Sequence, residues 1–533
     1  MNNTPKLSGV TACYVRRGSG FAVYACLVLL AALTAVGCSN TGAKSDNPPT
    51  VAATNPSRLR LGVTTPSQNG VVAVVNNLTA DSYIGISSNG RLTDRVIINP
   101  QWEPDMSAIT VTLRPNLKFH DGTAVDLAIF KEALTAALKA AQQPGTNVTF
   151  KSVIGVELVT RKDGTTEPDK LRIRLSRPEA FFLEDLANQT LRKPGADDIA
   201  TGPFQLVSSE GNVKLKAFAD YYRGRPKISE LEVQHFAESR AAWAALMRND
   251  IEAVSEMLES AIVGQNNVRA YAFVRPYYYQ LLFNVRNPAL KNPAVRQALS
   301  YAIDRKAVVE QALGAQGIVA ESPIWPFHWA HSTAQKVYVH NSEAATLRLD
   351  SVGLKVKKSA VPGQMPSRLR IRCLIPANNA QFEKMALLLQ KQLYEIGVDL
   401  AIETEDARNL MPRFAKGGSD AVLVTRSSGR SLAWTYLSFH SSESPGGYSA
   451  ADHVLEKLRQ TTDEATIRAG VSDLQQILHD DPPAIFIAWP KVARVVNSRI
   501  DVPKEETTES TAGRDVLSSL WQWDPNPNST RPR

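Results

Sequence analysis

Strand-like and helix-like patterns of hydrophobic residues follow one another along this chain from about residue 59. A strand is predicted at 59–65, and the alternation of apolar and polar residues at 109–113 predicts a half-buried strand. Asp126 is placed to cap a helix whose apolar residues recur on one side. Two strand-like runs flank an Asp-Gly pair within 156–178, which predicts a hairpin. This mixture of elements predicts α/β lobes.

The stretch 277–320 is the most informative part of the pattern. Aromatic and apolar residues at 277–285 predict a buried strand. Asn292 precedes a proline, as an N-cap precedes the first helical position, and apolar residues then recur at helical spacing. Asp304 is placed to cap a second helix, and Gly314 suits its left-handed end.

A strand, an amphipathic helix and a second strand are predicted after residue 367, with Gly397 ending the helix. This order is that of a βαβ unit. Cys373 lies in the apolar first strand, so we expect a buried structural thiol rather than a reactive one.

The amino-terminal segment has the pattern of a secretory signal, because basic residues precede a short apolar run at 21–36. Its end, AVGC, resembles a bacterial lipobox, although Ala35 stands where leucine is usual. The resemblance implies removal of 1–37 and lipidation of Cys38, with ordinary secretion and an uncleaved anchor as alternatives. The polar segment 38–57 then predicts a flexible tether.

Charge and motifs exclude several classes of function. The formal charge is +8, but basic and acidic residues are mixed along the chain, so we expect no nucleic-acid binding. The common nucleophile, metalloprotease, P-loop and dinucleotide motifs are absent, so we expect no enzyme activity and no cofactor.

Two histidine positions have structural interpretations that we favour over chemical ones. His120 and Asp121 form a tight turn before a glycine rather than a catalytic pair. His328 and His331 have a spacing that could suit a metal, but neighbouring prolines favour an irregular loop. Asp480 and its acidic neighbour most simply end a helix before two prolines.

The stretch 277–320 resembles the signature region of the family 5 extracellular solute-binding proteins, the dipeptide- and oligopeptide-binding subunits of ABC importers. The turn at 119–122 resembles the family's F-x-D-G turn, and 201–234 resembles its GTGPY-x-L strand with the turn that follows. The segment 474–496 resembles its helix, D-x-P break and return strand. The order and spacing of these motifs carry the resemblance, which runs from about residue 59 to 523.

The resemblance implies a two-lobed periplasmic-binding-protein-like (Venus flytrap) fold with an extra subdomain inserted in lobe one. We expect the chain to cross between lobes near 275–279 and 487–490. The segments expected are a signal peptide at 1–37, a tether at 38–57, lobe one at 58–85, 195–276 and 488–523, the inserted subdomain at 86–194, lobe two at 277–487 and a disordered tail at 524–533.

One departure from the family concerns ligand charge. Family members that bind peptides hold the free amino terminus with an aspartate, and by position Gly429 stands there in this chain. Arg426 and Arg430 replace two aromatic residues of the same motif. Arginine suits carboxylate or phosphate, so we expect a preference for anionic or blocked ligands over free-amine peptides. The alternative is that both arginines face solvent in a remodelled loop.

The residues expected to line the ligand cleft are mostly aromatic, and each could instead belong to the core. They are Tyr277, Tyr279, Asn284, Trp325, Phe327, Arg426, Ser427, Gly429, Arg430, Trp434 and Trp489.

The expected function is that of a lipid-anchored, monomeric substrate-binding protein on the outer face of the cytoplasmic membrane. It would capture a peptide or peptide-like solute and deliver it, unchanged, to an ABC permease. An alternative keeps the fold but drops transport, as in an envelope sensor or scaffold. An envelope hydrolase is a third possibility that the missing nucleophile motifs disfavour.

Overall fold

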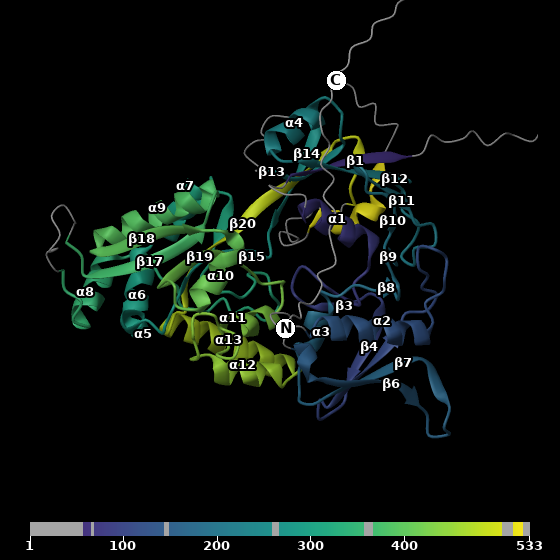
Figure 1. Cartoon of the computed structure of the whole chain (residues 1–533), viewed down its shortest axis with the longest axis horizontal. Helices are drawn as coiled ribbons and strands as arrows, with labels where there is room; N and C mark the ends of the chain where they lie inside the picture. The colour runs from purple at the N-terminus through teal and green to yellow at the C-terminus, as the bar shows by residue number, and fades with distance from the viewer. Residues whose placement is uncertain are drawn as a thin grey trace, which may run out of the picture. The chain divides into compact units, whose positions relative to one another are not determined.

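The 14-residue strand β20 (Ala484–Asn497) pairs with strands from both predicted lobes (Figure 1). Its carboxyl-terminal part pairs antiparallel with β13 (Ala253–Met257) and β14 (Val268–Val274). Its amino-terminal part pairs with β15 (Tyr277–Phe283) and β16 (Gly317–Val319). One path of hydrogen-bonded strands therefore runs through lobe one and lobe two.

The computed structural model describes residues 57–64, 69–142, 149–257, 266–356, 366–503 and 515–525. The predicted signal peptide, Cys38 and nearly all of the tether and tail lie outside these residues. Within them, no helix is both long and apolar enough to cross a membrane.

Three parallel strands form the centre of the lobe-one sheet. They are β1 (Arg58–Thr64), β12 (Glu230–Phe236) and β13, and β1 lies between the other two. Parallel strands end at the same edge of a sheet, so their carboxyl ends face the same space. The antiparallel strands β10 (Phe204–Ser208) and β11 (Val213–Ala217) extend the sheet beyond β12. The other elements of this lobe are α1 (Asn69–Thr79), α4 (Ser239–Met247), η5 (Val516–Gln522), β21 (Ile500–Asp501) and β22 (Asp524–Pro525).

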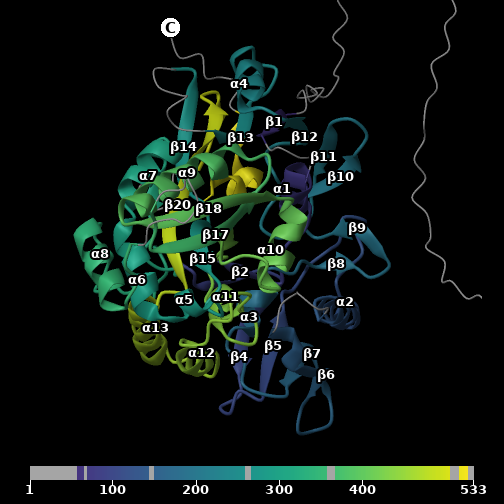
Figure 2. The ribbon, with the colours of Figure 1, turned by 60° about the vertical axis from the view of Figure 1, so that its left-hand side comes forward.

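Lobe two is a sheet covered on both faces (Figure 2). Its strands are β15, β19 (Ala421–Ser427), β17 (Leu369–Pro376) and β18 (Val398–Glu405). Along β15 the side chains alternate, so that Leu281 joins one hydrophobic core and Leu282 the other. The helices of this lobe are α5 (Pro288–Lys291), α6 (Pro293–Ala302), α7 (Arg305–Ala312), α8 (Ser342–Ser351), α9 (Ala380–Glu395), α10 (Ala407–Ala415), α11 (Ala433–Phe439), α12 (Asp452–Arg459) and α13 (Glu464–Asp480).

The inserted subdomain has a sheet and a hydrophobic core of its own. The sheet is antiparallel, in the order β4 (Ile97–Trp102), β5 (Ala108–Leu113), β7 (Thr166–Leu175) and β6 (Val153–Thr160). Its core is rich in phenylalanine, including Phe130 of helix α2. The remaining elements here are β2 (Ile84–Ile86), β3 (Leu92–Asp94), α2 (Leu127–Ala140), η1 (Thr149–Ser152), α3 (Phe182–Leu186), β8 (Arg192–Lys193) and β9 (Ala196–Ala200).

The predicted helix boundaries are confirmed by their hydrogen bonds. Asp126 accepts from the backbone N–H of the third residue after it at 2.8 Å, which caps α2. Asp304 caps α7 in the same manner, and Asn292 caps α6 by accepting from the backbone N–H of the second residue after it. Gly314 follows α7 with φ of +58°, the left-handed conformation that glycine tolerates best.

The predicted βαβ unit is also confirmed. Strands β17 and β18 pair in parallel and α9 connects them, with Gly397 at φ of +78° after the helix. Cys373 of β17 is completely buried, and burial raises the pKa of its thiol to about 12. The prediction of a buried thiol at this position is therefore confirmed.

Candidate ligand-binding site

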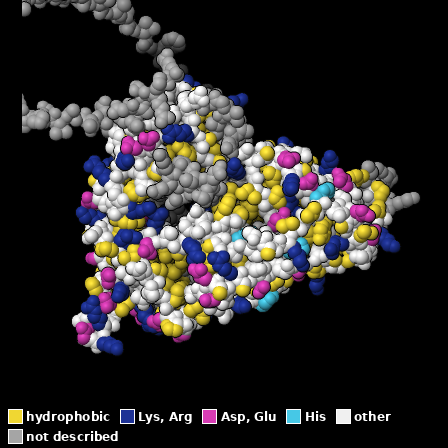
Figure 3. Space-filling view, turned by 180° about the vertical axis from the view of Figure 1, so that it is seen from behind, with side chains coloured by type: hydrophobic (Ala, Val, Ile, Leu, Met, Phe, Trp, Pro, Cys, Tyr) yellow, Lys and Arg dark blue, Asp and Glu magenta, His cyan; other side chains and the backbone are white. Residues whose placement is uncertain are grey.

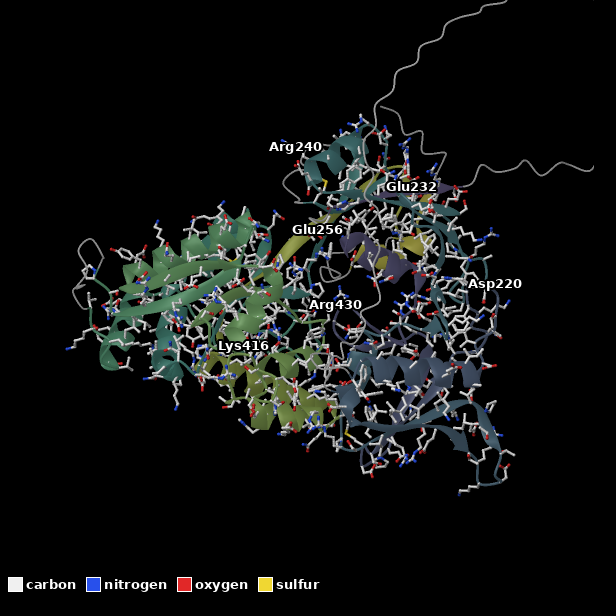
Figure 4. All side chains as sticks on the ribbon, in the orientation of Figure 1. Asp220, Glu232, Arg240, Glu256, Lys416 and Arg430 are labelled. Carbon is white, nitrogen blue, oxygen red and sulfur yellow. The ribbon has the colours of Figure 1, made fainter. Side chains whose placement is uncertain are left out.

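A cavity of about 590 Å³ lies at the carboxyl ends of β1 and β13. Val63 of β1 and Glu256 of β13 form the sheet side of its wall, and Glu256 is labelled in Figure 4. Most of the rest is formed by helix α1, the segment 80–95, residues from 187–190, the turn at 221–223 and η5. Ligands of open α/β sheets bind beyond the carboxyl ends of parallel strands, and pockets of roughly 300–1,000 Å³ hold small molecules. The cavity therefore has the position and size of a ligand site.

Two paired arginines form the part of the wall next to the sheet. Arg494 of β20 donates from Nε to Oδ1 of Asp515 at 2.9 Å and from Nη2 to the other carboxylate oxygen. Burial raises the pKa of Asp515, but the charge and hydrogen bonds of Arg494 outweigh it, so that the pKa is lowered. Arg275, which follows β14, forms an ion pair with Glu256. Both guanidinium groups are therefore neutralised by the protein itself.

The opposite part of the wall contains a buried carboxyl group. Asp81 is 7% exposed, and its Oδ1 accepts a hydrogen bond from the hydroxyl of Tyr221 at 3.2 Å. Its Oδ2 has no hydrogen-bond partner among the described residues. Burial raises the pKa of Asp81 to about 7, against the opposing charge of Arg95. This carboxyl therefore changes protonation near neutral pH.

Arg95 and Arg223 differ from the two paired arginines. Neither guanidinium group has a carboxylate partner in the described part of the chain. Arg223 lies over the ring of Trp521 at 5.1 Å, and that ring packs against Tyr221 with centroids 5.5 Å apart. The indole Nε1 of Trp521 is buried without a hydrogen-bond partner in the described structure. The wall thus offers several polar groups that the protein leaves unpaired.

Four of the predicted cleft residues lie within or beside the core of lobe two and do not line this cavity. Tyr279 is 5% exposed and donates its hydroxyl to Gln381 at 3.1 Å. Asn284 is buried and donates from Nδ2 to a backbone carbonyl at 3.3 Å. Trp489 is 2% exposed, and Tyr277 is partly buried. Their proposed contact with ligand stays a prediction.

Other predicted residues lie at the end of β19, in the loop that follows it and at the start of α11. Arg426 is partly buried and donates to the hydroxyl of Ser438 at 3.2 Å, while Ser427 is exposed. Gly429 has φ of +54°, and a Cβ there would lie 2.4 Å from Nε1 of Trp434. An aspartate at position 429 would therefore collide with this indole, whose Nε1 has no hydrogen-bond partner in the part of the chain described.

The guanidinium of Arg430, a residue labelled in Figure 4, lies 5.8 Å from the ring of Trp325. Trp325 is buried, with Phe327 against its edge at 5.2 Å, and donates its indole N–H to the carbonyl of Ser88 at 2.8 Å. A Cβ on Gly90 would lie 2.8 Å from the carbonyl oxygen of Arg430. The loop after β19 thus lies against the segment 80–95, which also supplies Arg95 to the cavity.

Further contacts join the inserted subdomain to lobe two. The hydroxyl of Ser431 and the backbone N–H of Ala433 both donate to Oε2 of Glu184, at 2.7 and 3.0 Å. Arg459 donates to the carbonyl of Pro178 at 2.9 Å and pairs with the buried Glu179. These contacts hold the walls of the cavity that the subdomain supplies in a defined position relative to lobe two.

The structure offers little for metal chemistry or for general charge attraction. Among the described residues, no group of three or more His, Cys, Asp and Glu side chains could hold a metal ion. His328 lies in an irregular segment, as predicted, and is buried. On the face shown in Figure 3, lysine and arginine side chains are interspersed with acidic ones.

Sequence reasoning missed the charged residues of the cavity. Asp81 and Arg95 come from one segment and Arg223 and Arg494 from two others, and the four residues carry no shared motif. One feature of the sequence did point to this site, because Arg275 lies at the predicted crossing between the lobes. A charged residue beside an interlobe crossing was the clue to this part of the site.

A two-lobed α/β fold with a cavity at the ends of parallel strands is the architecture of a solute-binding protein. The model of the bacterial extracellular solute-binding proteins, family 5 (middle region), matches residues 75–448. This chain belongs to that family. Its members bind solutes and are not enzymes, which confirms the predicted family and the absence of enzyme activity.

Relatives with known names support the same assignment. The dipeptide-binding protein of Escherichia coli K12 is 24% identical over 450 residues, which cover 75% of this chain and 82% of that protein. The glutathione-binding protein GsiB of Pectobacterium atrosepticum is 24% identical over 457 residues, covering 80% and 82%.

Solved structures share the fold. AppA of Bacillus subtilis in complex with a nonapeptide has a TM-score of 0.69 and 18% identity, covering 88% of this chain and 99% of that one. NikA of Brucella suis in complex with Fe(III)-EDTA has a TM-score of 0.74 and 17% identity, covering 86% and 99%. The expected two-lobed periplasmic-binding-protein-like fold is therefore confirmed.

Proposed function

We propose that this chain captures a peptide or peptide-like solute and presents it to an ABC permease for import. The observation that carries the proposal is a cavity of about 590 Å³ with unpaired polar groups, at strand ends, in a member of family 5. Relatives that bind dipeptides and glutathione support the class of ligand.

The mechanism is binding and closure without covalent chemistry. A ligand shifts a two-state protein toward closure only to the extent that it binds the closed state more tightly. The paired arginines beside β20 and the contacts of the subdomain with lobe two give the walls fixed positions before the ligand arrives. Such preorganisation reduces the entropic cost of binding.

The loop from Arg426 to Trp434 is proposed as a second contact surface for the ligand, together with Tyr277, Tyr279, Asn284 and Trp489. Support comes from the position of this loop against the segment 80–95. The space where an aspartate would hold a free amino terminus contains the indole of Trp434. We therefore propose that a free peptide amino terminus is a poor ligand at this loop.

The proposed location is the outer face of the cytoplasmic membrane, with a lipid on Cys38 as the anchor. Support comes from the lipobox-like AVGC sequence and from membership in an extracellular family. In cells labelled with a clickable palmitate analogue, we expect label on the wild-type chain and none on Cys38→Ser. An equally labelled Cys38→Ser chain would exclude this anchor.

Native mass spectrometry of the chain purified from its own host tests solute capture. We expect one additional small molecule per chain, released with unchanged mass on denaturation. Cross-linking in membranes then tests delivery, since a permease should be recovered in amounts that depend on that solute. Recovery that does not depend on solute would contradict the transport role and favour a sensor or scaffold.

A further inference from the structure

The cavity wall has more positive charge than its own carboxylates can neutralise. Among the described residues that line it, four are arginines and three are acidic. Two of the arginines are paired with Glu256 and Asp515. Neither Arg95 nor Arg223 forms an ion pair in the part of the chain described, although the charge of Arg95 acts on Asp81.

Both of these arginines line the cavity, and so does Tyr221. The ring of Tyr221 packs against Trp521, over which Arg223 lies at 5.1 Å. Arg95 comes from the segment 80–95 and Arg223 from the turn at 221–223. The two side chains therefore line the same cavity from two different segments.

The local structure leaves room for Arg95 to lie against the wall. A Cβ on Gly85 would be 3.0 Å from Nε of Arg95 and 2.4 Å from Oγ1 of Thr93. Arg223 is held by the turn that ends at Gly224, whose φ is +111°. A side chain at position 85 would thus crowd Arg95, and Arg223 directly precedes a glycine of positive φ.

We propose that Arg95 and Arg223 bind an oxyanion of the captured solute, a carboxylate or a phosphate. The proposal rests on the proposed function and specifies its ligand class. Guanidinium groups present several N–H donors in a plane and pair with oxyanions in two-point geometry. The solute is accordingly acidic at the end that lies beside Tyr221 and Trp521.

An ammonium group is the competing occupant, since Asp81 has an unpaired carboxylate oxygen. Asp81 is 7% exposed, and that oxygen is shielded from solvent, whereas Arg223 is exposed. Arg223 is therefore more accessible to an entering ligand than this oxygen is. A cation there would also be repelled by the positive charges of Arg95 and Arg223.

Isothermal titration calorimetry of the full chain tests the proposal with three probes. These are acetyl-trialanine, which has a carboxylate and no ammonium, its carboxyl-terminal amide, and inorganic phosphate. The variants are Arg95→Gln and Arg223→Gln, with Arg225→Gln as control because Arg225 is exposed and outside the cavity lining. Unfolding midpoints verify that each variant is folded.

We expect the wild type and Arg225→Gln to bind the acid at least about tenfold more tightly than the amide. The affinity of Arg95→Gln and of Arg223→Gln for the acid should fall about tenfold, while their affinity for the amide should not change, as removal of one charge-assisted contact predicts. Equal affinity for acid and amide, or unchanged affinity in both variants, would overturn the oxyanion site but leave peptide capture intact.

The phosphate probe separates the two proposals further. One possible result is that phosphate binds, that the peptides do not bind, and that both glutamine variants lower the affinity for phosphate. In that case the oxyanion site stands and the peptide assignment is wrong. If neither phosphate nor any peptide form binds the wild type, both proposals are wrong.

Discussion

At the scale of single residues, burial decides the chemistry of several groups in this protein. Asp185 on α3 is completely buried, accepts a hydrogen bond from Thr149 at 2.5 Å through Oδ2, and leaves Oδ1 without a partner among the described residues. Burial raises its pKa to about 7, and the nearby charge of Glu184 adds to the effect. The folded chain therefore keeps a proton that the unfolded chain releases.

This difference in protonation makes stability depend on pH. An unfolded aspartate loses its proton near pH 4, so the folded state binds more protons between about pH 4 and 7, and stability falls as pH rises through that window. Asp185→Asn should therefore gain stability relative to wild type as pH rises, by on the order of 2–4 kcal/mol at pH 8. Urea unfolding at pH 4, 6 and 8 measures this. The exposed Asp198→Asn is the control, and a pH-independent difference for Asp185→Asn would contradict the assignment.

Cys373 gives a second test at this scale. Because its thiol is completely buried and its pKa is raised to about 12, it should not react with iodoacetamide in the native protein. Peptide mapping should find the modification only after unfolding in urea. Modification of Cys373 under native conditions would show that β17 opens far more readily than this core allows.

At the scale of elements, the sequence predicted the boundaries of helices wherever nearby residues set those boundaries. The caps at Asp126, Asn292 and Asp304 and the left-handed Gly397 all lie within a few residues of the boundary they set. The cavity was not predictable in the same manner. Its charged residues meet only because strands distant in sequence pair with one another, as β1 does with β12 and β13.

The cap of α2 provides a prediction for one element. Asp126→Ala removes the acceptor for the backbone N–H of Ile129, and such losses cost about 1 kcal/mol. We expect urea unfolding to show this decrease in the free energy of unfolding, while Asp126→Asn retains most of the stability because asparagine also caps helices. If alanine and aspartate were equally stabilising, the cap would contribute nothing.

At the scale of the whole molecule, the positions of the cavity walls depend on long-range contacts. β20 contributes Arg494 to the lobe-one wall while pairing with lobe-two strand β15. The segment 80–95 contributes Arg95 while binding Trp325 of lobe two through Ser88. Both parts of the wall are therefore linked to lobe two by hydrogen bonds.

The claim that the solute binds in this cavity can be tested with two variants of α1 that lie one residue apart. Ala73 and Val72 are both exposed on α1, but Ala73 lines the cavity and Val72 does not. Ala73→Trp should fill cavity volume, and Val72→Trp should place the same ring outside it. The comparison separates blocked binding from a general effect of tryptophan on the helix.

The most direct measurement is the calorimetric affinity of these two variants for acetyl-trialanine, set against wild type. We predict one binding site per wild-type chain and an unchanged affinity in Val72→Trp. In Ala73→Trp the affinity should fall at least about tenfold, because a filled pocket excludes its ligand. Wild-type affinity in Ala73→Trp would mean that the solute binds elsewhere and would contradict the account.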